Sequence, residues 1–212
     1  MEQKELRDKL LRDSMEIWGD YNMEDEKESL TTKHRTYLFY SQKFEYHITN
    51  EDETYDRCSA VYSKLKESGI FEEEELKQPL VYRISYYNLL RVHDFEYIKK
   101  MINSQNRYKT HIDNRTYAGK YTSKIAELAA GSVIEAVNYL QNSELNFVSA
   151  FCLIRPPGHH AYRNCAEGYC FYNNAALGAT YAIEKFEVER VCILDWDVHH
   201  GDGTQDIFYD SK

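Results

Sequence analysis

The segment that decides the fold of this chain is Val191-Cys192-Ile193-Leu194-Asp195-Trp196-Asp197-Val198-His199-His200-Gly201-Asp202-Gly203. It begins with four aliphatic or sulfur-bearing residues in a row, which predict a strand buried on both faces, as in a parallel sheet. The polar residues that follow therefore stand at the carboxyl end of this strand. Since open α/β sheets bind ligands outside the carboxyl ends of their strands, we expect a reactive site here.

Three of these polar residues share one face of the chain. Side chains alternate in extended backbone, so Asp195, Asp197 and His199 point in the same direction. Carboxylate oxygen and neutral imidazole nitrogen are both good zinc ligands, and a catalytic zinc site uses three protein groups and a water. We therefore predict that Asp197 and His199 bind a metal. The alternative is that this run only ends a strand with solvated and capping groups.

A second segment has the same order of features, and it reads Ser149-Ala150-Phe151-Cys152-Leu153-Ile154-Arg155-Pro156-Pro157-Gly158-His159-His160-Ala161. The two prolines end an apolar strand because they lack backbone donors, and the glycine permits a turn. A single histidine is usually structural. A histidine pair after each of two apolar strands, His159-His160 and His199-His200, instead indicates a functional site.

Three motifs in this order resemble zinc-dependent histone deacetylases: Arg155-Pro156-Pro157-Gly158-His159-His160-Ala161, Gly168-Tyr169-Cys170-Phe171-Tyr172-Asn173, and the run from Leu194 to Gln205. The Arg-Pro-Pro and Asp-Trp-Asp-Val spellings resemble class II members more than class I. The resemblance implies an α/β fold, a three-layer parallel sheet that is arginase/deacetylase-like. It also implies hydrolysis of acetyl-lysine amides in histone or other protein tails.

The resemblance further implies the roles of the site residues. It makes Asp197 and His199 ligands of Zn²⁺, and it implies a structural K⁺ ion near Asp195. The catalytic residues are two pairs: His159 with Asp195, and His160 with Asp202. A carboxylate bonded to one ring nitrogen fixes the tautomer and raises the basicity of the other nitrogen. His160 is then expected to take a proton from zinc-bound water and return it to the leaving lysine amine, while His159 helps to hold that water.

Two further residues are expected to bind substrate. Gly168 and Tyr169 match a Gly-Phe pair that lines the acetyl-lysine tunnel in the family. The aromatic face of Tyr169 can flank the aliphatic lysine stem, but its hydroxyl needs a polar partner. The alternative is a tyrosine packed at a loop edge.

Other positions resemble family features less specifically. Arg57 matches an arginine beside an internal channel, and the alternative is a surface ion pair at a helix end. Asp113, Asn114 and Thr122 are candidates for the tunnel rim. His93 is expected to be structural.

Composition limits the possible partners. The net charge of −9 and the pI near 5.4 argue against direct binding to nucleic acid or to an anionic membrane surface, and they suit basic protein tails. The five cysteines form no Cys-x-x-Cys pair, and the start of the chain lacks the apolar core of a signal peptide. We therefore expect a cytoplasmic or nuclear protein. The resemblance to deacetylases implies co-repressor proteins as further partners.

The domain organisation follows from these motifs. Residues 1–34 are expected to be a polar amino-terminal extension, and residues 35–212 the amino-terminal portion of a histone deacetylase domain. We expect strands at 36–40, 149–154 and 191–194, helices at 58–68, 125–140 and 175–186, and a helix start at Glu72–Glu75. The strands at 149 and 191 should form a parallel βαβ unit that brings both histidine loops to one edge.

The resemblance places a third zinc ligand, an aspartate, and a carbonyl-binding tyrosine on strands that would follow Lys212. We therefore expect the sheet to be truncated after the Asp-x-Asp-x-His-His strand and the chain to be incomplete for catalysis. Asp206 and Asp210 are poor substitutes because they should lie on a helix that runs away from the site. We also expect the isolated chain to aggregate, because a truncated sheet leaves an unpaired edge.

Three functions remain open from the sequence. The first is a protein lysine deacetylase. The second is a deacetylase-like pseudoenzyme that binds partners without hydrolysing acetyl-lysine. The third is a polyamine deacetylase, which an acidic residue at the tunnel mouth would favour; the resemblance places that residue after Lys212.

Overall fold

The computed structural model describes residues 34–49, 53–104, 109–112 and 116–211. The expected amino-terminal extension lies outside these residues except for His34, so its boundary stays a prediction. Among the described helices, none is long and apolar enough to cross a bilayer.

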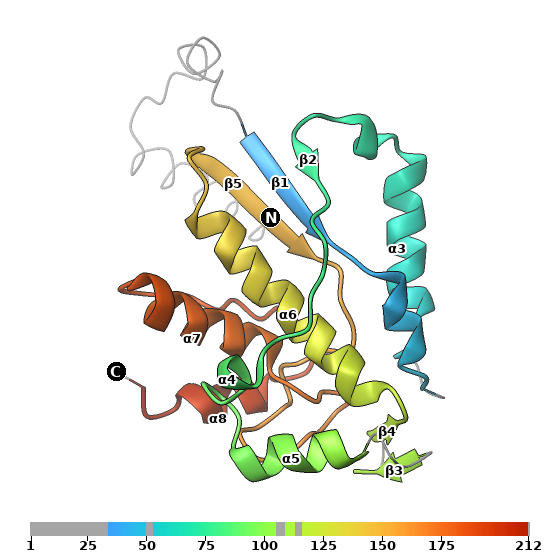
Figure 1. Cartoon of the computed structure of the whole chain (residues 1–212), viewed down its shortest axis with the longest axis vertical. Coiled ribbons are helices and arrows are strands. Elements are labelled where there is room, and N and C mark those ends of the chain that lie inside the picture. Colours follow the sequence, from blue (N-terminus) through green and yellow to red (C-terminus); the bar gives the residue numbers. More distant parts are fainter. Residues whose placement is uncertain (1–33, 50–52, 105–108, 113–115, 212) are drawn as a thin grey trace, which may run out of the picture. The chain divides into compact units, whose positions relative to one another are not determined.

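The centre of the fold is a parallel sheet with the strand order β2-β1-β5 (Figure 1). It contains β1 (His34–Phe39), β2 (Leu76–Lys77) and β5 (Phe147–Cys152). Strands β1 and β5 pair in parallel along their whole length, with Thr36 opposite Ser149. The hydroxyl groups of these two residues lie 2.8 Å apart and add a side-chain contact to the ladder. The predicted parallel sheet and its strands near 36 and 149 are confirmed.

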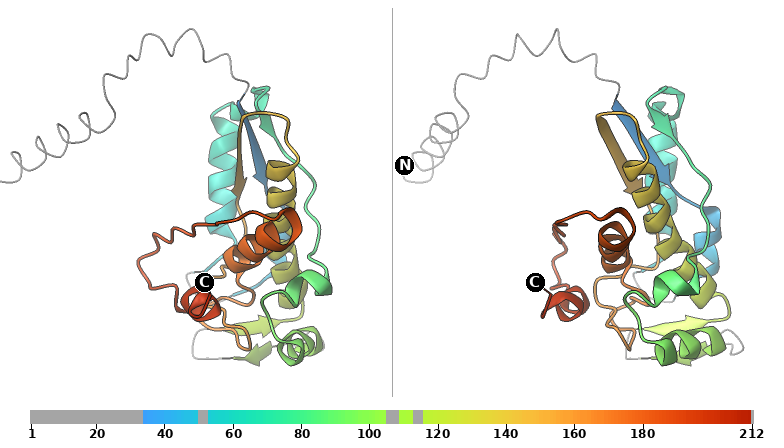
Figure 2. Two further views of the ribbon diagram at one scale, coloured as in Figure 1. Left: turned by 90° about the vertical axis from the view of Figure 1, so that its left-hand side faces the viewer. Right: turned by 60° about the vertical axis from the view of Figure 1, so that its left-hand side comes forward.

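Helices cover both faces of this sheet and make it the middle of three layers (Figure 2). Because strand side chains alternate, Tyr37 and Phe39 pack against Ala136 of α6 (Thr122–Gln141) on one face. On the other face Leu38 packs against Cys58 of α3 (Asp56–Glu67). The three-layer α/β architecture predicted from the resemblance is therefore confirmed.

The predicted helices form with small shifts at their ends. Gly69 follows α3 with φ of 76°, the left-handed conformation expected of a residue that ends a helix. Asn173 caps α7 (Asn174–Phe186) because its side chain accepts a hydrogen bond from the backbone of Ala176. A short 3₁₀ helix, η1 (Gln42–Tyr46), follows β1.

The expected helix start at Glu72–Glu75 is wrong. Only a 3₁₀ turn, η2 (Ile70–Glu72), forms, and Glu73 is already extended with ψ of 133°. The chain then enters β2, where Leu76 pairs with Thr36 of β1. Pairing with the sheet overrides the preference of the acidic run for a helix start, because it gives hydrogen-bond partners to backbone N–H and C=O groups that a helix end would leave unpaired.

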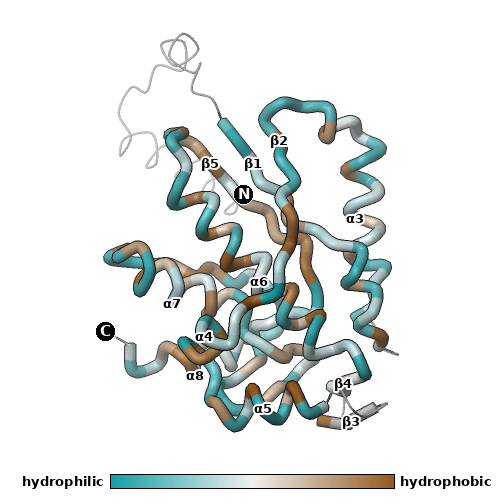
Figure 3. Tube along the Cα trace, in the orientation of Figure 1, coloured by the Kyte–Doolittle hydropathy of each residue, from teal (hydrophilic) through white to brown (hydrophobic). Residues whose placement is uncertain are grey.

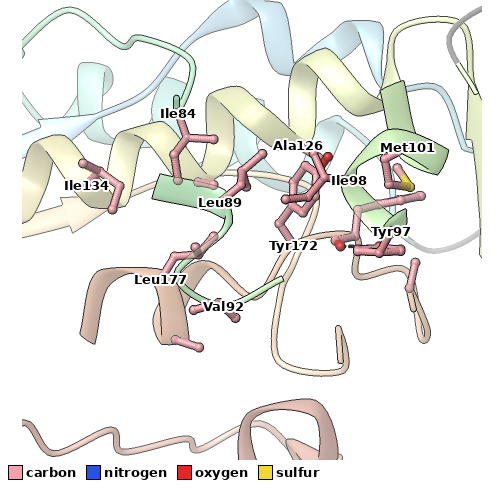
Figure 4. Packing of buried hydrophobic residues seen from close by; sticks show 14 of the residues in the cluster. Ile84, Leu89, Val92, Tyr97, Ile98, Met101, Ala126, Ile134, Tyr172 and Leu177 are labelled. Carbon is pink, nitrogen blue, oxygen red and sulfur yellow. Dashed lines mark hydrogen bonds between the residues drawn. The ribbon is translucent and has the colours of Figure 1, made fainter. Parts of the chain in front are cut away.

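The largest hydrophobic core lies between α6, α7 and two helices at one end of the sheet, α4 (Tyr86–Leu89) and α5 (Phe95–Ser104) (Figure 4). In Figure 3, α5 alternates between hydrophilic and hydrophobic positions along its length. Its Ile98 and Met101 are buried in this core, and the hydroxyl of Tyr97 donates to the carbonyl of Phe171 at 2.5 Å. A two-stranded hairpin follows α5 and contains β3 (Lys109–His111) and β4 (Tyr117–Gly119).

The strand expected at 191–194 is absent, which is the main correction to the sequence-based fold. Residues 190–200 have no regular secondary structure, and they run outside the sheet between α7 and the last helix, α8 (Asp202–Phe208) (Figure 2). Leu194, Trp196 and Val198 are 79%, 91% and 93% exposed. A parallel strand exists only where its backbone pairs with a neighbour, and among the described residues β5 pairs with β1 alone. The expected βαβ unit from 149 to 194 is therefore wrong, and the parallel pairs are instead β1 with β5 and β1 with β2.

Candidate active site

The loop that follows β5 is anchored by a buried arginine. Arg155 is 1% exposed, and its guanidinium donates to both carboxylate oxygens of Glu53 at 2.8 and 2.9 Å. It also donates to the backbone carbonyls of Phe44, His47 and Glu53. These five hydrogen bonds tie the start of the loop to η1 and to the segment before α3. The positions of His159 and His160 are thus defined relative to the sheet.

Two histidine–aspartate pairs lie side by side at the end of this loop. Nδ1 of His159 is 2.9 Å from Oδ2 of Asp195, and Nδ1 of His160 is 2.7 Å from Oδ1 of Asp202. The two imidazole rings have centroids 4.1 Å apart. The structure brings together all four residues that the sequence predicted as catalytic, although the strand expected to carry Asp195 does not form.

The electrostatics of the second pair keep Asp202 ionised. Partial burial alone would raise the pKa of Asp202, but hydrogen bonds from His160 and from the backbone N–H of Gly203 lower it below its usual value. A hydrogen bond from Tyr162 has the same effect, and the pKa of Tyr162 rises to about 12 through burial and its contact with Asp202. An ionised Asp202 holds the proton of His160 on Nδ1, so that Nε2 is left as an acceptor.

The expected metal ligands lie next to this pair but are engaged with each other. Oδ1 of Asp197 accepts hydrogen bonds from the backbone N–H of His199 at 2.8 Å and from its ring Nδ1 at 3.0 Å. The backbone hydrogen bond from His199 holds the pKa of Asp197 below its usual value. The ring of His199 has its centroid 6.1 Å from that of His160.

These donors fit zinc in type but not in number. One carboxylate and one imidazole are ligands that zinc accepts, whereas a catalytic zinc site uses three protein ligands. No group of three or more His, Cys, Asp or Glu side chains arranged to hold a metal occurs among the described residues. Asp206 and Asp210 are exposed, and neither joins such a group among the described residues.

Gly168 and Tyr169 form a tight turn beside His160. Glu167 and Cys170 exchange two backbone hydrogen bonds, and the two residues between them have φ of 53° and 68°. These are the φ signs of a type I′ turn. The backbone N–H of Tyr169 donates to the hydroxyl of the buried Thr116 at 2.9 Å. The structure thus places the two residues expected to bind substrate next to the histidine pairs.

Comparison with known proteins decides the family. Residues 51–212 match the histone deacetylase domain. The chain belongs to the histone deacetylase family. It is 36% identical to a probable deacetylase of Archaeoglobus fulgidus, over 83% of this chain and 46% of that protein. Histone deacetylase 6 of Caenorhabditis elegans is 31% identical, over 86% of this chain and 20% of that protein. Polyamine deacetylase HDAC10 of Rattus norvegicus is 35% identical, over 76% of this chain and 28% of that protein.

The fold agrees with a solved member of the histone deacetylase family. The crystal structure of the HDA15 HD domain superposes with a TM-score of 0.78 at 31% identity, over 85% of this chain and 51% of that chain. The chain spans about half the length, or less, of the relatives described here. The relatives are of the class II type, as the motif spellings predicted.

Some residues that resembled deacetylase features lie elsewhere. Arg57 is exposed in the first turn of α3, which favours the alternative of a surface residue at a helix end over a channel arginine, whereas Arg155 is buried. Thr122 is buried, and its hydroxyl accepts a hydrogen bond from the backbone N–H of Gly119. Asp113 and Asn114 lie outside the described residues.

His93 is structural, as expected. Its Nδ1 contacts the carbonyl of Tyr162 at 2.9 Å, and its Nε2 accepts the backbone N–H of Asn173 at 3.0 Å. Sequence reasoning missed two other contributors to the site: Glu53, which pairs with Arg155, and the side chain of Asn173. The pairing of Glu53 with Arg155 spans 102 positions, so no local spacing signals it.

Proposed function

We propose that the protein hydrolyses the acetyl amide of acetyl-lysine in histone or other protein tails. The observation that carries this proposal is the pair of His–Asp contacts, at 2.7 and 2.9 Å, on adjacent imidazole rings. Adjacent histidines that each have an ionisable carboxylate on Nδ1 present two Nε2 atoms for proton transfer. Membership of the histone deacetylase family supports amide hydrolysis as the reaction.

In this proposal His160 is the general base. Its Nε2 accepts a proton from the attacking water while Asp202 stabilises the imidazolium that forms. The same proton then passes from Nε2 to the leaving lysine amine, so that the imidazole ends neutral. Nδ1 of His159 contacts Asp195, so its Nε2 is the atom that forms a hydrogen bond with the attacking water and orients it.

We further propose that Asp197 and His199 supply two zinc ligands and that a third comes from outside the described residues. A bound zinc ion supplies a Lewis acid for the amide carbonyl and lowers the pKa of a bound water. The hydrogen bond between Asp197 and His199 keeps the two donors adjacent. A structural potassium ion near Asp195 stays a prediction.

Tyr169 is proposed to contact the substrate stem. It stands in the turn beside His160, where its ring can pack against an aliphatic chain. An open cavity of about 320 Å³ also borders the site, lined by residues 157–159, the start of α7 and residues 193–197.

Acetylated polyamines are the second candidate substrate class. This chain is 35% identical to a protein named as a polyamine deacetylase. A pseudoenzyme that binds partners is the alternative to both substrates. We propose a cytoplasmic or nuclear location, acetylated proteins and co-repressor proteins as partners, and no direct contact with nucleic acid or membrane.

The test combines metal analysis with activity assays on the purified protein. We expect bound zinc, hydrolysis of an acetyl-lysine peptide in preference to an acetylated polyamine, and loss of activity in His160→Ala. His200→Ala is the matched control, since His200 is exposed and its Nε2 pairs with Oε1 of Gln205 at 2.7 Å, outside the two His–Asp pairs. A folded protein that binds zinc but hydrolyses neither substrate would favour the pseudoenzyme, and preference for the polyamine would favour the second candidate.

A further inference from the structure

The position of Asp202 near His160 requires an anchor that the sheet does not provide. Residues 190–200 form no strand. Within the part of the chain that the structure describes, the hydrogen bonds of residues 195–199 involve the side chains of Asp195 and Asp197 or the ring of His159. Asp202 is the first residue of α8, so the contacts of α8 with the rest of the fold decide where its carboxylate lies.

One anchor is the side chain of Asn173. This residue is fully buried, and its Nδ2 donates to the hydroxyl of Thr204 at 2.9 Å and to the carbonyl of Ala161 at 3.2 Å. Its Oδ1 accepts the backbone N–H of Ala176 at 3.0 Å. The amide group therefore joins three segments: the start of α7, the histidine loop and the first turn of α8.

The first turn of α8 also rests directly on the backbone of the histidine loop. The backbone N–H of Thr204 donates to the carbonyl of His159 at 3.0 Å, and its hydroxyl lies 3.4 Å from the same carbonyl. A Cβ atom added to Gly203 would lie 2.5 Å from the carbonyl oxygen of Ala161. There is no free space between this turn and the loop, so a small movement of α8 moves Asp202 relative to His160.

The far end of α8 is fixed independently. Arg163 donates to the carbonyl of Ile207 at 2.7 Å, and Ile207 is buried in the main core. Loss of the contact at Thr204 should therefore loosen the first turn of α8 and leave the helix attached.

We infer that Thr204 is a positioning residue, held in place by the buried side chain of Asn173. Thr204 fixes the first turn of α8 against the histidine loop, so that the carboxylate of Asp202 reaches Nδ1 of His160. The inference rests on the proposed function in one respect: it assumes that His160 and Asp202 are the pair that transfers protons. The structural evidence for it is independent of that function and consists of the contacts among Asn173, Thr204 and His159.

The test uses the tautomer of His160 as its readout. A carboxylate on Nδ1 selects the Nδ1–H tautomer, and the ring ¹⁵N chemical shifts distinguish the two tautomers at a pH where the ring is neutral. Thr204→Val removes the hydroxyl with almost no change of shape, whereas Thr204→Ser keeps it. We expect the native protein and Thr204→Ser to show Nδ1–H, and Thr204→Val to lose this signature in favour of the Nε2–H form.

Ile134→Val is the control for stability. Ile134 is buried in the core on α6, and its substitution removes one methyl group away from the histidine loop. We expect Ile134→Val to keep the Nδ1–H signature at a similar or larger loss of thermal stability. An unchanged tautomer in Thr204→Val, or a tautomer change in Ile134→Val, overturns the inference.

The tautomer measurement separates this inference from the proposed function, because it does not depend on hydrolysis and can be compared with a separate activity assay. Loss of the signature in Thr204→Val supports the positioning role even if the protein is inactive. Conversely, activity with an unchanged tautomer in Thr204→Val supports the proposed function and overturns the positioning role.

Discussion

Gly168 lies directly behind the imidazole ring of His160. A Cβ atom at position 168 would come within 2.5 Å of Cδ2 and 2.9 Å of Cγ of that ring. Gly168 also has φ of 53°, which side chains other than hydrogen disfavour. The turn that presents Tyr169 and the histidine proposed as general base are therefore in contact, and neither can move without the other.

Gly168→Ala should displace the ring of His160 from Asp202 and lower kcat/KM for acetyl-lysine hydrolysis by roughly 10- to 100-fold, a typical cost of disturbing the residues that orient an active-site ligand. Gly69→Ala is the matched control. Gly69 has φ of 76° but no atom within 4 Å of an added Cβ. The Gly69→Ala variant should lose only about 1 kcal/mol of stability and keep its activity. Equal activity losses in both variants would contradict the contact.

Tyr169 is a non-glycine residue in the left-handed region, with φ of 68°. Tyr169→Asn should be at least as stable as the native protein, because asparagine tolerates this conformation. Tyr169→Val should be less stable by about 1–2 kcal/mol, because branching at Cβ disfavours it. Urea denaturation of both variants measures the difference. A valine variant as stable as the asparagine variant would argue against strain in this turn.

Glu53→Gln should destabilise the fold by about 3–5 kcal/mol, since it leaves the buried guanidinium of Arg155 without its carboxylate. Glu67→Gln is the control, because it breaks an ion pair with Lys64 in which both side chains are largely exposed. That control should change the free energy of unfolding by less than about 1 kcal/mol. Chemical denaturation compares the two, and similar small changes would mean that Arg155 does not depend on Glu53.

Stability should fall as the pH decreases from 6.5 towards 4 because of His93. Burial lowers the pKa of His93 to about 4, although hydrogen bonds to the backbone of Tyr162 and Arg163 oppose this shift. Between these pH values the unfolded chain binds a proton that the folded chain does not, so acid favours unfolding. The loss should reach about 3 kcal/mol, since one pKa unit corresponds to about 1.4 kcal/mol.

The measurement is the free energy of unfolding as a function of pH, with His93→Gln for comparison. Glutamine can replace both hydrogen bonds of His93 but does not titrate. The variant should be less stable near neutral pH and should show a shallower decline between pH 6.5 and 4. Parallel curves for the two proteins would remove His93 as the cause.

The isolated 212-residue chain should self-associate through residues 190–198. Trp196 and Val198 are 91% and 93% exposed, and among the described residues β5 has a neighbouring strand on one side only. Exposed apolar side chains and an open sheet edge each favour association. The double variant Leu194→Ser, Trp196→Ser should shift the protein towards monomer in size-exclusion chromatography with light scattering. A monomeric native chain with a sharp thermal transition would refute this prediction.

Local signals predicted three helices, α3, α6 and α7, close to their observed bounds. The apolar spacing of α6, the asparagine cap of α7 and the glycine after α3 are short-range features of the sequence. The apolar run at 191–194 failed as a signal, because it reports that a segment prefers burial and does not report whether a neighbouring strand is there to pair with it.

The sequence by itself determined the family and the identity of the four paired residues, because the motifs around His159, His160, Asp195 and Asp202 are contiguous and each can be recognised without a fold. Only the tertiary structure decided how the pairs are held. The buried contact of Glu53 with Arg155 and the amide of Asn173 between α7 and α8 join residues that are distant in sequence. Hydrogen bonds of this kind depend on distances and angles that exist only after the chain has packed, so no spacing along the sequence encodes them.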